Sequence, residues 1–198
     1  IVHPTYKPQK LTRSAHTSWT IGNYAPTADP FTSTNNYPSC VAIYEERLVF
    51  ANTNANPQKI FFSKSGDFED MTTGTNADDG LTFTIGSDQV NAVRYLSSMR
   101  TLIIGTTGGE FTATASSTSE PITPTNIQIK RQSAYGSANV DVIPVANVTL
   151  FLQRAKRKLR ELVYDYNVDS YVAPDLTILA EHITKTGITQ LSYQQEPD

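Results

Sequence analysis

The chain has 198 residues, of which 18% are charged and 38% are hydrophobic, and its formal net charge at pH 7 is −3. This length allows one domain or two small ones. The weak net charge excludes a global electrostatic field that would draw in nucleic acid or an anionic membrane. The single cysteine, Cys40, excludes an internal disulfide framework and a thiolate metal cluster. No apolar run approaches the ~20 residues of a membrane-spanning helix.

Residues 1–40 are predicted to be a loop-rich N-terminal segment that finishes or wraps a blade formed by the rest of the chain. Five prolines interrupt this segment, and proline cannot donate a hydrogen bond in a central strand. Only Ser18–Ile21 has a strand-like pattern. We expect Trp19, the only tryptophan, to pack in the core.

Residues 41–198 are predicted to form repeated antiparallel β blades, because one pattern occurs in them three times. Each copy begins with an apolar strand and a polar interruption, and then continues with a denser apolar strand, a turn and another strand. Leu48, Leu102 and Leu150 are the equivalent residues, roughly 50 residues apart, which is the length of a four-stranded propeller blade. The fold class is therefore predicted to be mainly β, with two to three antiparallel, β-propeller-like blades. Because three blades are too few for a propeller and the chain begins at Ile1, we expect a fragment of a longer protein.

The alternation of apolar and polar residues places the individual strands. Phe50, Ile103 and Phe151 are expected on central strands and buried. The predicted strands are 41–50, 58–64, 81–85, 93–104, 110–115, 126–131, 148–153 and 159–165.

One short helix is predicted near the C-terminus, over residues 174–183. Pro174 suits a first helical position, and Leu176, Leu179 and Ile183 recur with helical spacing. We expect this stripe to pack against a sheet. A last strand is predicted over Ile188–Tyr193.

The sequence offers no constellation that predicts catalysis, a metal site or a cofactor. The three histidines lack metal-ligand spacing, and Asp78-Asp79-Gly80 lacks the alternating carboxylates of a calcium loop. We interpret that segment as a connecting loop and Cys40 as a small buried residue. The chain is predicted not to be an enzyme and to need no cofactor.

The one concentration of charge lies between two predicted strands, so it is predicted to be a hairpin tip that contacts protein or solvent. Weak, sequence-independent contact with DNA is the other interpretation, because a cationic cluster can neutralise a few phosphates. No aromatic residue within the cluster is available to stack on bases. The candidate contact residues are Arg154, Lys156, Arg157, Lys158 and Arg160.

Several runs of the sequence resemble the propeller-containing portion of bacteriophage tail nozzle, or tail tubular B-type, proteins of short-tailed phages and prophages. They include YPSCVAIYEERLVFANT, PQKIFFSKSGDFEDM and FLQRAKRKLRELVYDYNVDSYVAPDLTILAEHI, and the resemblance covers most of residues 1–193. It implies a structural virion component that forms a homo-oligomeric ring around the genome-ejection channel, with other tail or portal proteins as partners. It also implies localisation in the virion tail, after assembly in the bacterial host cytoplasm, and no contact with a membrane.

A carbohydrate- or surface-binding β-propeller module is the alternative function. Its signature would be a cluster of exposed aromatic side chains. The ten tyrosines are spread along the sequence, which favours the structural virion component.

Overall fold

The structure is a computed structural model that describes residues 1–86, 90–117 and 119–196. These residues form β-strands, turns and loops, and none of them lies in a helix. The chain divides into two compact units. Unit 1 consists of Ile1–Val93 and Thr114–Gln128, and unit 2 consists of Arg94–Ala113 and Ile129–Asp198. The prediction of a mainly β fold is confirmed.

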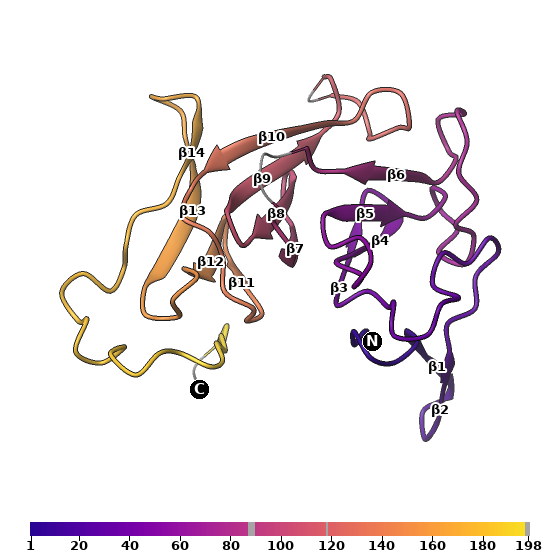
Figure 1. Cartoon of the computed structure of the whole chain (residues 1–198), viewed down its shortest axis with the longest axis horizontal. Coiled ribbons are helices and arrows are strands. Elements are labelled where there is room, and N and C mark those ends of the chain that lie inside the picture. The colour runs from indigo at the N-terminus through magenta and orange to yellow at the C-terminus, as the bar shows by residue number, and fades with distance from the viewer. Residues whose placement is uncertain (87–89, 118, 197–198) are drawn as a thin grey trace. The chain divides into compact units, whose positions relative to one another are not determined.

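The strands of the described residues form one two-stranded and three four-stranded antiparallel sheets (Figure 1). The two-stranded sheet pairs β1 (Gln9–Ala15) with β2 (Ser18–Asn23). The first four-stranded sheet contains β3 (Cys40–Tyr44), β4 (Arg47–Ala51), β5 (Lys59–Phe62) and β6 (Leu81–Thr84). The second contains β7 (Val93–Ser98), β8 (Leu102–Thr106), β9 (Gly109–Thr114) and β10 (Gln128–Ser133). The third contains β11 (Ile143–Val145), β12 (Val148–Leu152), β13 (Leu159–Asp165) and β14 (Ser170–Val172).

Each four-stranded sheet is an up-and-down meander, in which strands adjacent in sequence are hydrogen-bonded neighbours. Leu48, Leu102 and Leu150 lie on the second strand of the three successive sheets, so the sequence repeat corresponds to one sheet. None of the sheets closes on itself, and the sheets of the described chain do not make a propeller. The predicted sheets are therefore confirmed, but the predicted propeller-like arrangement is wrong. Alternation of apolar and polar residues decides which face of a sheet each side chain occupies, and it carries no information on how separate sheets are arranged.

The predicted strand 41–50 is two strands joined by a tight turn. Tyr44 pairs with Arg47, and Glu45 and Glu46 between them have φ values of 45° and 59°. Positive φ at both central residues defines the type I′ turn, whose twist matches that of the strands it joins. The predicted strand 93–104 is likewise two strands, β7 and β8, which residues 99–101 connect.

The core of unit 1 lies against the first four-stranded sheet. Phe50 and Phe61 are paired across β4 and β5, and the ring of Phe31 packs edge-on against both. Tyr24 and Met71 complete this buried cluster. Two aromatic residues from the first 40 therefore cover one face of the sheet.

The core of unit 2 joins its two four-stranded sheets. Tyr95 and Ile103 from the second sheet pack with Phe151 and Leu162 from the third, and all four side chains are buried. The ring centroids of Tyr95 and Phe151 are 6.2 Å apart. Phe50, Ile103 and Phe151 are all buried on strands, as predicted.

The predicted helix over 174–183 is wrong. Successive turns occupy this segment, with hydrogen bonds from Ala180 N to Thr177 O and from Ile183 N to Ala180 O. The carboxylate of Asp175 accepts hydrogen bonds from both the N–H and the hydroxyl of Thr177, and this local bonding competes with helical bonding. The expected apolar stripe is also unpacked, since Leu179 is 94% exposed.

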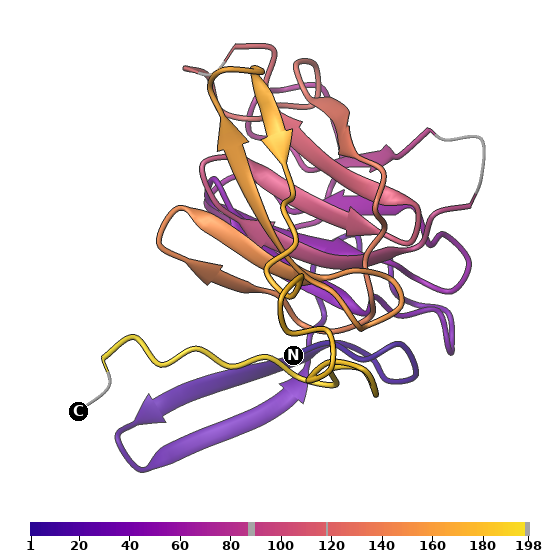
Figure 2. The ribbon, with the colours of Figure 1, turned by 90° about the vertical axis from the view of Figure 1, so that its left-hand side faces the viewer.

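Two further expectations are corrected. Ile188–Tyr193 forms no strand, and its start is held by a hydrogen bond from Ile188 N to Lys156 O. Trp19 is not in the core but 54% exposed, on the hairpin of β1 and β2. Figures 1 and 2 show this hairpin extending away from the β3–β6 sheet. Its first strand, β1, was not predicted at all.

Candidate functional site

Residues 153–158 join β12 to β13, so Arg154, Lys156, Arg157 and Lys158 of the basic cluster form a hairpin tip as predicted, whereas Arg160 lies on β13. Arg154, Lys156 and Arg157 are exposed there. Lys156 has a φ of 62°, and the tip is tied down by a hydrogen bond from Arg154 N to Gly136 O. Among the described residues, these three side chains take part in no hydrogen bond or ion pair. They are therefore the part of the cluster that can meet a partner or solvent.

Lys158 is engaged with the C-terminal segment. Its Nζ lies 3.0 Å from Asp175 Oδ2 and 3.3 Å from Glu181 Oε1. Hydrogen bonds to these two carboxylates raise the pKa of Lys158. The pKa of Asp175 is lowered to about 2, chiefly because the Thr177 hydroxyl donates to its carboxylate, with Lys158 adding to the effect. Lys158 therefore anchors the turns that follow β14.

Arg160 is buried, with 9% of its surface exposed. Its Nε donates to Gln153 Oε1 at 3.0 Å, and its Nη1 donates to the Ala173 carbonyl at 2.6 Å. Its guanidinium carbon lies 3.6 Å from the centre of the Tyr135 ring. Arg160 is thus a structural residue and is not available to a partner. The five cations that the sequence brings together have three different roles in the structure.

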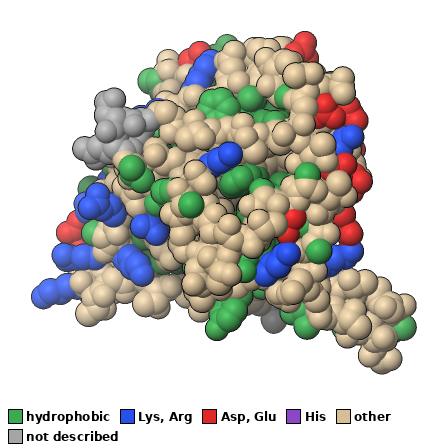
Figure 3. Space-filling view, turned by 45° about the vertical axis from the view of Figure 1, so that its right-hand side comes forward, with side chains coloured by type: hydrophobic (Ala, Val, Ile, Leu, Met, Phe, Trp, Pro, Cys, Tyr) green, Lys and Arg blue, Asp and Glu red, His purple; other side chains and the backbone are tan. Residues whose placement is uncertain are grey.

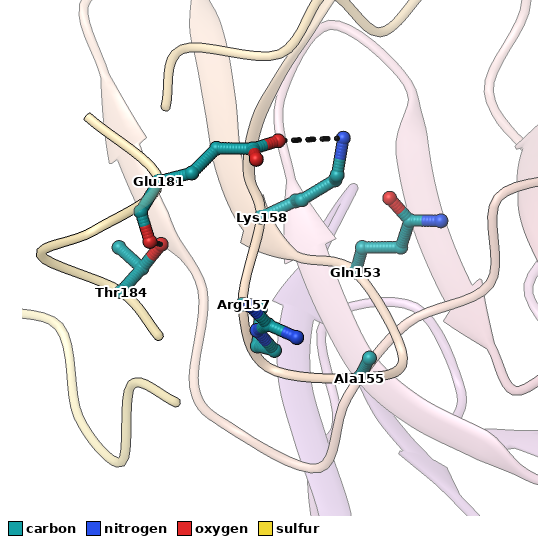
Figure 4. A pocket seen from close by; sticks show the side chains of 6 residues that line it. All are labelled: Gln153, Ala155, Arg157, Lys158, Glu181 and Thr184. Atoms are coloured by element: carbon teal, nitrogen blue, oxygen red, sulfur yellow. Dashed lines mark hydrogen bonds and ion pairs between the residues drawn. The ribbon is translucent and has the colours of Figure 1, made fainter. Parts of the chain in front are cut away.

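A cavity of about 250 Å³ lies beside the tip (Figure 4). In Figure 4 the Glu181 carboxylate points toward Lys158, and both Glu181 and Thr184 come from the C-terminal segment. Gln153, Ala155, Arg157 and Lys158 come from the β12–β13 connection. Because Glu181 and Lys158 neutralise each other, Arg157 is the unpaired charge among the described residues that line this cavity.

The exposed cations of the tip suit contact with an anionic surface. The exposed cations could neutralise about three phosphates, which supports only weak and salt-sensitive attraction to nucleic acid. Within the described ranges, no group of three His, Cys, Asp or Glu is placed to hold a metal ion. None of those ranges contains a helix long and apolar enough to cross a membrane.

The Asp78-Asp79-Gly80 segment is a connecting loop held by a buried arginine. Arg47, 2% exposed, donates from Nη1 to the carbonyls of Ser63 and Asp79 and from Nη2 to the carbonyl of Ala77. The Lys64 ammonium lies 3.7 Å from Asp79 Oδ1. Arg47 thus holds the backbone of the loop, and the Lys64 ammonium faces the carboxylates of Asp78 and Asp79.

A buried carboxylate lies in unit 2 and was not singled out from the sequence. Glu110 on β9 is fully buried, and it accepts hydrogen bonds from the hydroxyls of Ser133 and Ser137, the latter at 2.7 Å. Burial raises the pKa of Glu110, and these hydrogen bonds oppose that shift. Its neighbour Tyr95 also has a raised pKa, because burial disfavours the phenolate. Glu110 ties β9 to the end of β10 and to the segment that follows it.

Three tyrosines that are distant in the sequence come together at a second cavity in unit 2, or next to it. Tyr135 and Tyr171 line this cavity of about 440 Å³, and the ring centroid of Tyr164 lies 5.5 Å from that of Tyr171. Sequence reasoning missed this cluster because Tyr135 follows β10 whereas Tyr164 and Tyr171 lie on β13 and β14. Only the pairing of β13 with β14 and the approach of β10 bring them together.

Gly136 fixes the position of Tyr135. It has a φ of 72°, and a Cβ at this position would come within 2.3 Å of the Thr107 carbonyl oxygen. Both the left-handed backbone and the close approach require glycine. The tight turn directs Tyr135 onto Arg160.

Comparison with known proteins adds no family to this picture: no protein-family model matches the chain, and no curated protein matches it.

Proposed function

We propose that this chain is a structural, non-enzymatic component of a bacteriophage tail, acting through contacts with other copies of itself and with other tail or portal proteins. The proposal rests on the sequence resemblance described above and on one structural observation. That observation is the apolar face of the β1–β2 hairpin, which no described residue covers.

The two faces of the hairpin differ in chemistry. Leu11 pairs with Ile21 and Arg13 pairs with Trp19, and alternation along the strands places all four on the same face. Lys10, Thr12, Thr20 and Gly22 occupy the other face. We call the first set, Leu11, Arg13, Trp19 and Ile21, the hairpin face. One face is thus apolar and the other polar, which is the pattern of a sheet that covers something.

The hairpin face remains exposed, with Leu11 at 54% and Ile21 at 62%. A two-stranded hairpin without a packed face is only marginally stable in water. The Arg13 guanidinium lies 5.6 Å from the centre of the Trp19 ring, and Trp and Arg are the residues most enriched where protein interfaces derive their affinity. Hydrophobic side chains also reach the surface elsewhere, for example between polar ones on the view in Figure 3. These features support burial of the hairpin face against another protein.

Three meandering four-stranded sheets also suit a scaffold. Units of this kind are blade-like, and a blade buries both of its faces only when neighbouring units stack on it. In unit 2 the second and third sheets already pack through Tyr95 and Phe151. We propose that such stacking continues in the assembled ring around the channel through which the genome leaves.

Particle assembly tests this proposal. We expect Trp19→Ser combined with Ile21→Ser to lower the yield of tailed particles at least tenfold, while the circular dichroism of the purified chain stays unchanged. The matched control is Thr12→Ser combined with Thr20→Ser, on the polar face of the same hairpin, which should leave the yield unchanged. Mass spectrometry of purified particles should detect the chain. Its absence from particles, or normal assembly of the hairpin-face variant, would refute the proposal.

A further inference from the structure

The 440 Å³ cavity of unit 2 has the construction of a ligand site. It lies between two sheet edges: β10 is an edge strand of the second sheet, and β14 is an edge strand of the third. Gln132 and Ser133 of β10 line one side, and Tyr171 of β14 lines the other. Its volume is within the range of small-molecule sites, about 300–1,000 Å³. It is separate from the hairpin face, which belongs to unit 1.

Tyr135 provides a flat and rigid surface in this cavity. The Arg160 guanidinium lies 3.6 Å from the ring centre and covers one face of the ring, yet 43% of Tyr135 is exposed. Because Arg160 covers one face, a ligand in the cavity can reach the ring only by its opposite face or its edge. Arg160 is itself fixed by Gln153 and by the Ala173 carbonyl, so the platform is held in place before any ligand arrives.

The opposite wall is equally well supported. The Tyr171 hydroxyl shares a hydrogen bond of 3.0 Å with the Thr101 hydroxyl, and its ring packs edge-on against Tyr164. The Tyr171 N–H donates to Gln132 Oε1 at 3.4 Å, and Gln132 Nε2 donates to Thr112 Oγ1 at 2.8 Å. The Gln132 side chain therefore already accepts the hydrogen bond from the Tyr171 N–H on the free edge of β14. A peptide that added a strand to this edge would need that same N–H, so the geometry disfavours a peptide as the ligand.

The chemistry of the lining selects the class of ligand. None of the described side chains that line the cavity is charged, and they combine two aromatic rings with an amide and a hydroxyl. A strand of nucleic acid would need cations for its phosphates. A sugar ring presents an apolar C–H face that can lie on a tyrosine, and hydroxyl groups around its edge that can bond to polar groups and backbone. We propose that this cavity binds a neutral saccharide of one or two rings, with Tyr135 as the stacking platform.

Titration calorimetry and saturation-transfer NMR on the whole chain test this inference. The probes are glucose, galactose, mannose and N-acetylglucosamine, together with their homodisaccharides and homotrisaccharides. We expect saturable binding of at least one probe below ~10 mM. Tyr135→Ser should weaken that binding at least tenfold, and Tyr135→Phe, which keeps the ring, should preserve it. The matched control is Tyr166→Ser, which removes a tyrosine that is 87% exposed and outside the cavity.

A second variant keeps the test valid if Tyr135→Ser unfolds the chain. Ala134 is exposed and lines the cavity, so Ala134→Trp should fill the space without removing a core contact and should abolish binding. The inference is overturned if no probe binds saturably, if Ala134→Trp binds as the natural chain does, or if only acidic sugars such as glucuronic acid bind. Because the hairpin face is in unit 1, failure here leaves the assembly proposal unaffected, and the reverse also holds.

Discussion

Arg160 should contribute more to stability than any other residue of the basic cluster, and Arg160→Met tests this. Methionine keeps a flexible apolar stem but removes both donors, so the Gln153 amide oxygen and the Ala173 carbonyl lose a charged partner. Hydrogen bonds to charged groups contribute about 1.5–3 kcal/mol each, and the contact with Tyr135 adds about 1–2 kcal/mol. The cost of burying the guanidinium offsets part of this sum. We expect a net loss of about 3 kcal/mol in the free energy of unfolding.

Urea denaturation followed by far-ultraviolet circular dichroism measures this loss, which corresponds to a fall in Tm of roughly 6–12 °C for a chain of this size. Arg157→Met is the matched control, because Arg157 lies on the same hairpin but is exposed. It should change the unfolding free energy by less than about 0.5 kcal/mol. If Arg160→Met is as mild as Arg157→Met, the division of the cluster into structural and exposed cations is wrong.

Three further substitutions test other parts of the structure. Glu46→Gly should stabilise the chain by about 0.5–1 kcal/mol in the same denaturation assay, because glycine adopts the φ of 59° without steric cost; destabilisation would contradict the turn geometry. Glu110→Gln should remove a pH dependence. Because burial raises the folded-state pKa of Glu110, its folded form binds more protons, so stability should decline as pH rises from about 4.3, the ordinary glutamate value, through the raised pKa. Denaturation at several pH values should show this decline in the natural chain and not in the variant; equal slopes would refute the assignment. Phe151→Asp should abolish cooperative folding, since Phe151 is fully buried between two sheets and an unpaired charge there costs several kcal/mol. A soluble variant with an unchanged circular dichroism spectrum would contradict this packing.

The strands could be predicted because their signal is local. Val49 and Ala51, two residues apart, are fully buried on β4, and Leu102 and Ile104 are fully buried at the same spacing on β8. A strand with one face against a core has an apolar residue at every second position, and this alternation is visible in the sequence. The tight turn at Glu45 and Glu46 was not predicted, because glutamate is not typical of positions with positive φ and carries no turn signal.

The helix was predicted wrongly for a reason that is also physical. The spacing of Leu176, Leu179 and Ile183 is helical, but such a pattern forms a stable helix only when its apolar side packs on something. Here the Leu176 N–H donates to the Leu159 carbonyl of β13, and the Thr177 N–H donates to the Asp175 carboxylate. These bonds hold the start of the segment against β13 and replace the first turn of a helix. Trp19 is the opposite case, a residue whose size predicts burial but whose hairpin has no covering element within the described chain.

The sequence by itself determined the β class, the recurrence of sheet-forming units and the location of the basic tip, because strand periodicity and turn chemistry act over a few residues. Only the tertiary structure decided which cations of the tip are exposed, which carboxylate is buried and which tyrosines share a cavity. Arg160 is separated by two residues from exposed Arg157, yet it meets Tyr135, a residue brought to it from the end of another sheet. Contacts of that kind depend on how sheets pack, and packing is a property of the whole chain that no local pattern records.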